Sequence, residues 1–284
     1  MKFGFLKMHG AGNDFVVLAD PDARFPVGDP ALVRRLCAPH AGLVCEGLLV
    51  LRKRGAPAGA DLRMVFFNPD GSRAGMCGNG LRCAVFAAGL FGFAAGPAVS
   101  VATDAGVLAA RLVASDPAAG RATVSARFSE PRGRRPAVRL ASGSAREWFA
   151  VDTGVPHAVA FVEDLAAVDV AAEGPAVRRA PEFAPAGTNV DFAQVLGPHA
   201  LAIRTYERGV EAETAACGTG SVAAAVAAVE TGRCESPVDV RVAFGDVLRV
   251  EAARGAGGLC RDVVFSGPAR VVCRGELDTD WFGA

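Results

Sequence analysis

The residues best suited to chemistry are two cysteines, Cys77 and Cys217, each set in a Cys-Gly-x-Gly motif. A run made almost wholly of small apolar residues follows each motif, at 81–88 and at 221–228. A thiol that ionises can act as a base or as a nucleophile. Two thiols on opposite faces of one carbon could remove a proton from one face and deliver another to the other face, which inverts that carbon.

The two motifs predict that helices position these thiols. The glycines form a turn, and the apolar run after it predicts a helix that is buried on all sides. The unpaired N–H groups and the helix dipole give a helix N-terminus partial positive charge. A cysteine at this point is therefore expected to ionise readily, and a carboxylate ligand is expected to bind beside it.

The same pattern indicates what the thiols could act on. The α-hydrogen of an amino acid is a very weak acid, so its removal needs both a positioned base and stabilisation of the carbanion. The chain has three lysines, Lys2, Lys7 and Lys53, and none follows a phosphate-binding glycine loop. Two helix N-termini could instead stabilise the substrate carboxylate, which gains electron density in the transition state. The sequence therefore favours racemisation or epimerisation without a pyridoxal cofactor.

The composition suits one large globular domain or two ordinary ones. The 284 residues are 51% hydrophobic, and 30 basic residues balance 30 acidic ones. This balance argues against nucleic acid as a partner, and the basic run 132–139 is predicted to be an exposed loop. The N-terminus lacks an apolar signal segment, and glycines interrupt the uncharged stretch 83–101, so no membrane partner is expected. With eight cysteines, we expect a cytoplasmic protein with reduced thiols.

Strand-like segments and one apolar helix occur in each half of the chain, so an internal duplication is expected. Gly187–Phe192 in the second half echoes Gly12–Phe15 in the first. We predict an N-terminal half at 1–118 and a C-terminal half at 119–265, and the tail 266–284 could return to the first half. A further helix is expected to begin at Pro30, with Asp29 as its N-cap.

Six groups of residues, in order along nearly the whole chain, resemble the diaminopimelate epimerase family. They are His9–Phe15, Asn68–Ser72 with Met76–Gly80, Gly154–His157, Thr188–Val190, Tyr206–Gly209 with Ala216–Gly220, and Gly267–Ala269. The resemblance implies an α+β fold of two pseudo-symmetric halves, each a curled β-sheet wrapped around a central apolar helix, with the site in a cleft between them. It also implies conversion of LL-diaminopimelate to the meso isomer, in lysine and peptidoglycan biosynthesis, by a homodimer that needs no cofactor or metal.

The resemblance assigns a role to each matching residue. Cys77 and Cys217 would be the acid–base pair, assisted by His157 and Glu207. Four residues would surround the reacting carboxylate: Gly78, Asn79, Gly218 and Thr219. The remainder of the substrate would be held by Asn13, Asn68, Asn189 and Arg208, with Glu207 also in contact. The planar guanidinium of Arg208 suits this role, because it can bind a carboxylate through two hydrogen bonds.

Two departures from the family pattern leave the substrate open. Val155 stands where an asparagine is usual before Pro156-His157, and Gly42–Gly47 differs from the usual Gly-x-Gly-x-Asp-Gly. One alternative is therefore a racemase or epimerase of the same fold that acts on another amino acid. The other is a non-catalytic anion- or nucleotide-binding module, since Gly218–Ala223 fits the dinucleotide pattern but follows a polar segment. A structural role is expected for the other cysteines: Cys37, Cys45, Cys83, Cys234, Cys260 and Cys273.

Overall fold

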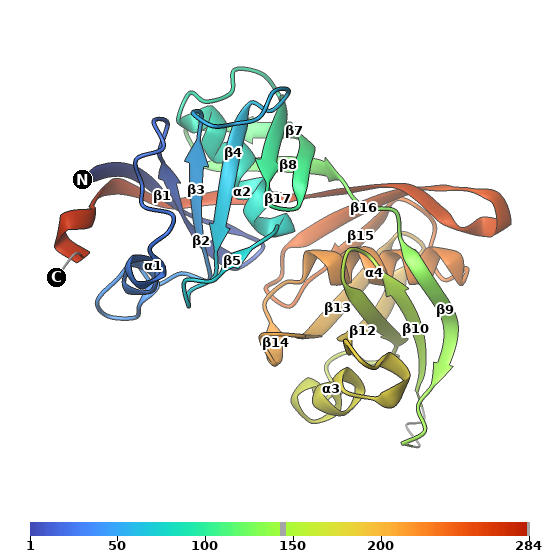
Figure 1. Cartoon of the computed structure of the whole chain (residues 1–284). Helices are drawn as coiled ribbons and strands as arrows, with labels where there is room; N and C mark the ends of the chain where they lie inside the picture. The colour runs from blue at the N-terminus through green and yellow to red at the C-terminus, as the bar shows by residue number, and fades with distance from the viewer. Residues whose placement is uncertain (143–145, 283–284) are drawn as a thin grey trace. The chain divides into compact units, whose positions relative to one another are not determined.

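A computed structural model describes residues 1–142 and 146–282 (Figure 1). Two compact units make up the chain: residues 1–126 together with the segment from 267 onward, and residues 127–266. The division at 126/127 lies beyond the boundary expected at 118/119. The reason is strand β8 (Arg121–Arg127), which pairs with β7 (Gly106–Asp116) of the first unit. Within the described residues, no helix is long and apolar enough to cross a membrane.

The first unit is a β-barrel closed around a helix. Its strands are joined in the order β1, β2, β3, β4, β6, β7, β8 and β17, and β17 pairs back with β1. Besides β7 and β8, the bounds are β1 (Lys2–Gly10), β2 (Asn13–Ala19), β3 (Leu48–Arg52), β4 (Leu62–Phe67), β6 (Ala98–Thr103) and β17 (Cys260–Asp278), with the short β5 (Arg73–Ala74) beside β4. Helix α2 (Gly78–Leu90) packs against the inner faces of these strands, and its residues from Asn79 to Ala88 are all buried.

Helix α1 (Pro30–Cys37) covers the outer face of the same strands. Neighbouring residues on a strand point to opposite faces, so Val17 and Leu49 contact the α2 core while Val16 and Leu48 belong to the α1 core. The predicted start of α1 is confirmed, because the Asp29 side chain accepts a hydrogen bond from the Leu32 N–H at 2.9 Å.

The second unit repeats this plan. Its strands run in the order β9, β10, β11, β12, β13, β15, β16 and the first part of β17. Their bounds are β9 (Arg132–Arg139), β10 (Glu147–Asp152), β11 (Pro156–Phe161), β12 (Asn189–Gly197), β13 (Ala200–Glu207), β14 (Ala212–Thr214), β15 (Val238–Arg241) and β16 (Val247–Arg254). Helix α4 (Gly218–Glu230) contacts β10 to β13, β15 and β16, and α3 (Val170–Arg178) contacts β12 and β13. Short 3-10 helices occur at Pro181–Phe183, Ala256–Gly258 and Thr279–Phe282.

The pairing of strands shows that the two units share one topology. In each, an antiparallel hairpin (β1–β2, β10–β11) leads to a parallel pair (β2–β3, β11–β12). An antiparallel pair (β3–β4, β12–β13) and then a second parallel pair (β4–β6, β13–β15) follow. Along the chain, the central helix connects the two strands of this second parallel pair. The predicted fold class, two pseudo-symmetric halves each wrapped around a central apolar helix, is confirmed.

One local prediction was wrong. The basic run Arg132–Arg139 is not a loop but strand β9, which pairs with β10 through Trp148 and Val138. Strands pair through backbone hydrogen bonds, and strands at the edge of a sheet tolerate charged side chains. The many arginines of this segment therefore do not exclude a strand.

Candidate active site

Each predicted catalytic cysteine is the N-cap residue of a central helix. Cys77 has extended backbone angles (φ −137°, ψ 126°), and its carbonyl accepts the first helical hydrogen bond of α2, from Leu81 N–H at 2.8 Å. Cys217 occupies the same place before α4, and its carbonyl accepts from Ser221 N–H at 2.9 Å. The turn-then-helix prediction is therefore correct in both units.

Around Cys77, a set of amide groups forms the first half of the candidate site. The Cys77 thiol donates to Asn13 Oδ1 at 3.6 Å, and the Asn79 amide donates to the same oxygen at 3.2 Å. Arg82 donates to Asn79 Oδ1 at 2.8 Å. The Asn13 amide nitrogen donates to the Glu46 carboxylate, which also accepts from the Asp14 N–H at 3.3 Å. Glu46 therefore holds Asn13 with its oxygen turned toward Cys77.

Asn68 lies in the turn that joins β4 to β5 in the same unit. Its amide nitrogen donates to Ser72 Oγ at 3.0 Å, and its backbone N–H donates to the Ser72 carbonyl at 2.9 Å. Gly71 has φ +84°, and a Cβ on it would lie 2.3 Å from the Pro30 carbonyl oxygen. Only glycine fits this turn, which presents the half-buried Asn68 just before the Cys77 motif.

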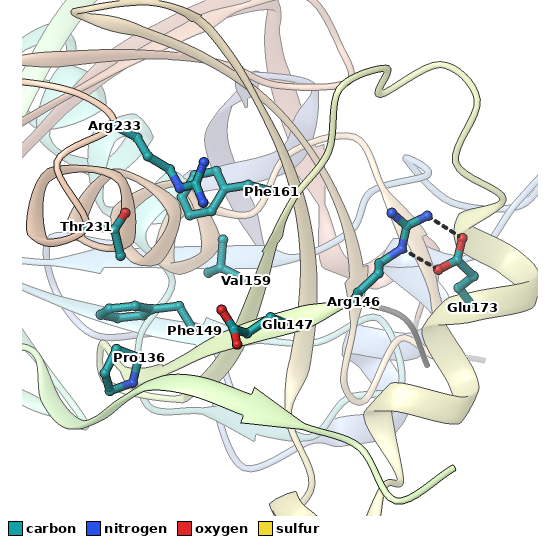
Figure 2. Close-up of a pocket in the computed structure, with 9 residues that line it drawn as sticks. All are labelled: Pro136, Arg146, Glu147, Phe149, Val159, Phe161, Glu173, Thr231 and Arg233. Carbon is teal, nitrogen blue, oxygen red and sulfur yellow. Dashed lines mark hydrogen bonds and ion pairs between the residues drawn. The ribbon is translucent and has the colours of Figure 1, made fainter. Parts of the chain in front are cut away.

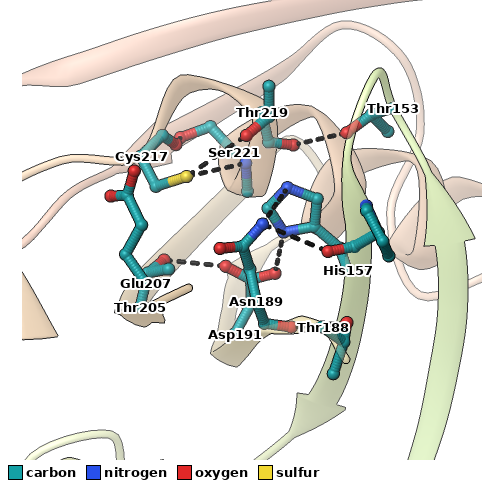
Figure 3. A network of polar contacts seen from close by, with 12 residues as sticks. Thr153, His157, Thr188, Asn189, Asp191, Thr205, Glu207, Cys217, Thr219 and Ser221 are labelled. Atoms are coloured by element: carbon teal, nitrogen blue, oxygen red, sulfur yellow. Dashed lines mark hydrogen bonds and ion pairs between the residues drawn. The ribbon is translucent and has the colours of Figure 1, made fainter. Parts of the chain in front are cut away.

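In the second unit, the Cys217 sulfur accepts a hydrogen bond from the Gly220 N–H and lies 3.3 Å from Thr219 Oγ1 (Figure 3). Burial raises the pKa of the Cys217 thiol well above its usual value, and the carboxylates of Glu207 and Asp191 raise it further. The hydrogen bonds from Thr219 and Gly220 act in the opposite direction and are outweighed. The expectation that this thiol ionises readily at its helix N-terminus is therefore wrong, because burial outweighs the helix N–H groups.

His157 is buried and is oriented by an aspartate. Its Nδ1 lies 2.7 Å from Asp191 Oδ2, and Thr205 Oγ1 donates to the other oxygen of Asp191 at 2.7 Å. A carboxylate at Nδ1 favours a proton on that nitrogen and fixes the orientation of the ring. The three residues come from neighbouring strands, β11, β12 and β13, whose register brings them together (Figure 3).

Asn189 links His157 to the segment that carries Glu207 and Arg208. Its amide nitrogen donates to the Pro156 carbonyl at 3.1 Å and lies 3.4 Å from His157 Nε2. Its oxygen accepts from the Arg208 N–H at 2.8 Å. The Arg208 guanidinium donates to the Ala186 carbonyl at 3.2 Å. Glu207 ends β13, and its carboxylate accepts from Thr214 Oγ1 at 3.0 Å.

The structure thus gathers the predicted residues into two groups, one in each unit. Asn13, Cys77 and Asn79 are joined directly in the first group, with Gly78 at the start of α2 and Asn68 in its turn. In the second group, hydrogen bonds join His157 to Asn189, Asn189 to Arg208, and Cys217 to Thr219, with Gly218 at the start of α4 and Glu207 at the end of β13.

Three residues that the sequence reasoning did not single out belong to these groups: Glu46, Asp191 and Thr205. Asp191 had a signal, since it is an acidic residue between two apolar ones, Val190 and Phe192, two positions after Asn189. Residues two apart on a strand share a face, so Asp191 could have been placed beside Asn189. Glu46 also had a signal, since it stands at the Asp position of the Gly-x-Gly-x-Asp-Gly pattern with which Gly42–Gly47 was compared. Thr205 had none, because it reaches the site through strand pairing.

A cavity in the second unit lies apart from these groups, and the described residues form no metal-binding cluster. Among the described residues, no three histidine, cysteine or acidic side chains are placed to hold a metal ion. A cavity of about 590 Å³ lies in the second unit, where Arg233 covers the ring of Phe161 and Arg146 pairs with Glu173 (Figure 2). None of the predicted site residues lines it.

Comparisons with known proteins agree on the family and on the fold. A family model described as diaminopimelate epimerase matches residues 5–125 and 149–258. Proteins named diaminopimelate epimerase from Chlorobaculum tepidum and Moorella thermoacetica are 38% and 39% identical to this chain. The alignments cover 95% and 97% of this chain and 99% of each relative.

Solved structures support the same architecture. A phenazine biosynthesis protein of the PhzF family from Bacillus anthracis aligns with a TM-score of 0.74 at 13% identity, over 98% of this chain and 99% of the other. A hydroxyproline epimerase from Agrobacterium vitis aligns with a TM-score of 0.71 at 16% identity, over 97% of this chain and 92% of the other. At such low identity, the likeness shows a shared fold.

Proposed function

This chain belongs to the diaminopimelate epimerase family, and we propose that it converts LL-diaminopimelate to the meso isomer by cofactor-free, two-base proton transfer. The observation that carries the proposal is the repeated placement of a cysteine as the N-cap of a central helix, Cys77 before α2 and Cys217 before α4. A helix N-terminus favours a carboxylate, so each thiol has a site for the reacting group beside it.

In this mechanism Cys217 acts as the acid and Cys77 acts as the base. The raised pKa of Cys217 supports its role as the protonated partner. Cys77 takes the α-hydrogen, and the electron pair of the broken C–H bond spreads into the carboxylate, which the helix N–H groups stabilise. The Cys217 S–H then delivers its proton to the opposite face, which inverts the carbon. The reverse reaction exchanges the two roles.

The other residues divide between the reacting end and the far end of the substrate. Asn79 and Thr219 follow the two cysteines, so with Gly78 and Gly218 they border the carboxylate. Asn13, Asn68, Asn189 and Arg208 bind the remaining polar groups, and the Arg208 guanidinium suits the second carboxylate. His157 and Glu207 assist the acid–base step, and the hydrogen bond to Asp191 keeps the His157 ring in one orientation. The protein is further proposed to be a cytoplasmic homodimer.

The deciding experiment is the incubation of purified, dialysed protein with LL-diaminopimelate in D₂O, without added pyridoxal phosphate. We expect the meso isomer to form and solvent deuterium to appear at the α-carbon. Cys77→Ala and Cys217→Ala should each abolish epimerisation while the circular dichroism spectrum stays native. Wild-type turnover by either variant would contradict the two-base mechanism, and a lack of deuterium incorporation would favour a non-catalytic binding module.

Val155 supports one second candidate, a racemase or epimerase of another amino acid. It lies in the tight turn before Pro156-His157, where the Thr153 N–H donates to the Val155 carbonyl at 3.2 Å. Its apolar side chain offers no hydrogen bond to a distal polar group, which an asparagine at this place would offer. Assays with monocarboxylic amino acids distinguish the two: higher kcat/KM on any of them than on LL-diaminopimelate would favour the second candidate. Val155→Asn should then shift the preference toward diaminopimelate.

A further inference from the structure

Two cysteines outside the candidate active site face each other in the first unit. Cys37 is the last residue of α1, and Cys45 lies in the loop between α1 and β3. Their sulfur atoms are 3.4 Å apart, and both residues are buried, with 4% and 7% of their surface exposed. Packing alone does not require two thiols in contact, because each could pack against carbon.

The surroundings make one thiol of the pair more reactive than the other. The contact with Cys37 lowers the pKa of Cys45, and the nearby Lys7 ammonium lowers it further, whereas burial acts in the opposite direction and is outweighed. The pKa of Cys37 is raised, by its contact with Cys45 and by burial. Cys45 is therefore the better nucleophile, and Cys37 is the thiol placed to react with it in a second step.

The loop that carries Cys45 leads directly to the proposed site. The next residue, Glu46, accepts hydrogen bonds from the Asn13 amide and from the Asp14 N–H. Asn13 in turn accepts from the Cys77 thiol and from Asn79. One peptide bond and two hydrogen bonds thus connect Cys45 to Cys77.

We propose that Cys37 and Cys45 form an oxidation site, at which a small peroxide joins the two sulfurs in a disulfide, and that this bond draws Glu46 away from Asn13. The first part is independent of the proposed function, whereas the effect on activity rests on it. Burial of both sulfurs favours a small neutral oxidant such as hydrogen peroxide over a bulky disulfide or a protein.

The chemistry balances with hydrogen peroxide as the only oxidant. The Cys45 thiol ionises, and its thiolate attacks one peroxide oxygen as the O–O bond breaks. The leaving hydroxide takes up the proton that Cys45 released, which forms water. The resulting sulfenic acid is then attacked by the Cys37 sulfur. The S–O bond breaks, and the hydroxyl group leaves as water with the Cys37 proton. Two thiols lose two electrons in all, and one peroxide becomes two waters.

Closing this bond requires movement in the loop. A disulfide has sulfurs about 2.05 Å apart, so the two atoms must approach by more than an ångström. Cys37 is held by the helix and by its place in the α1 core. Cys45 is in the loop, after Val44, which is more than half exposed and has φ +42°. We therefore expect Cys45 and its neighbour Glu46 to move when the disulfide forms, while Cys37 stays in place.

The chemistry is tested in the full chain with Cys77→Ser and Cys217→Ser, so that the proposed catalytic thiols cannot react. Trypsin cuts after Arg35 and Arg52, and one peptide, Leu36–Arg52, contains both cysteines. After hydrogen peroxide, we expect this peptide to lose two hydrogens and to resist alkylation until dithiothreitol is added. Adding Cys45→Ala should remove this product, while adding Cys260→Ala, at a buried cysteine of the second unit, should leave it. Full alkylation after peroxide, or separate oxidation of each sulfur, would overturn the proposal.

The effect on activity is tested by comparing wild-type protein with Cys37→Ala and Cys260→Ala during exposure to hydrogen peroxide. We expect Cys37→Ala to lose activity several-fold more slowly than the other two, and dithiothreitol to restore the wild-type protein. Equal rates for Cys37→Ala and wild type would overturn the link through Glu46. A lack of epimerase activity before exposure would instead contradict the proposed function, and would leave the peptide result unaffected.

Discussion

Cys217 illustrates, at the scale of a residue, how two opposing effects act on one thiol. The helix N–H groups favour the thiolate, whereas burial and the carboxylates of Glu207 and Asp191 favour the neutral thiol. Burial has the larger effect, because the free energy needed to remove a charge from water exceeds the free energy gained from the Gly220 and Thr219 hydrogen bonds. A protonated Cys217 is suited to donate a proton, which is the role proposed for it.

This raised pKa leads to a pH-dependent stability. Between the usual thiol pKa of 9.0 and the higher value in the folded state, the unfolded chain releases the Cys217 proton while the folded protein keeps it. The unfolded chain then binds fewer protons, so stability falls as pH rises, by up to about 1.4 kcal/mol per pH unit. Cys217→Ser removes this titration, and urea unfolding of the variant should show a shallower decline above pH 9. Parallel curves for the two proteins would contradict the raised pKa.

Asp191 gives a second prediction at this scale. In Asp191→Asn the amide cannot hold His157 with a proton on Nδ1 as a carboxylate does, so we expect kcat to fall by about a hundredfold. The pH dependence of kcat should also change, which a purely structural loss would not produce. Asp239→Asn is the matched control, because Asp239 pairs with Arg249 on the surface of the same unit. Unchanged kinetics in Asp191→Asn would exclude a positioning role.

At the scale of elements, the two central helices differ at one equivalent glycine. A Cβ at Gly220 in α4 would lie 2.4 Å from Asp191 Oδ1, whereas a Cβ at Gly80 in α2 would meet Leu49 at an ordinary 3.4 Å. The start of α4 is therefore packed directly on the carboxylate that orients His157. The start of α2 leaves room for a methyl group.

This difference predicts unequal effects of the same substitution. Gly220→Ala should lower stability by about 1–3 kcal/mol through overpacking, and should reduce activity by displacing Asp191. Gly80→Ala should stay within about 1 kcal/mol of the wild-type stability, since alanine has the better helix propensity. Urea denaturation of both variants measures the contrast. Equal losses would show that the contact with Asp191 does not matter.

At the scale of the whole molecule, the two units depend on one shared strand. The first part of β17 pairs with β16 in the second unit, and its later part pairs with β1 and closes the first barrel. The Val271 N–H also donates to the Gly120 carbonyl at 2.7 Å, which joins β17 to the segment before β8. Two strands of the first unit therefore rely on residues far from them in the sequence.

Removing the chain from Gly267 onward should therefore open the first barrel. We expect amide hydrogen exchange to lose its protection first in β1 and β8, while β11 to β13 of the second unit stay protected. Removing only the residues after Asp280 is the control, because β17 ends at Asp278. Native protection of β1 in the longer truncation would contradict this account of the barrel.

The sequence by itself determined what depends on local chemistry and repetition. Cysteine, glycine and small apolar residues at matching spacing predicted both helix starts, and Asp29-Pro30 predicted the start of α1, because caps and turns are set by neighbouring residues. Only the tertiary structure decided what depends on strand register and burial. Asp191 reaches His157 through β11 and β12, Cys45 reaches Cys37 through a loop, and Cys217 keeps its proton because it is buried. These contacts join distant residues, and the free energy of such contacts is absent from any short stretch of sequence.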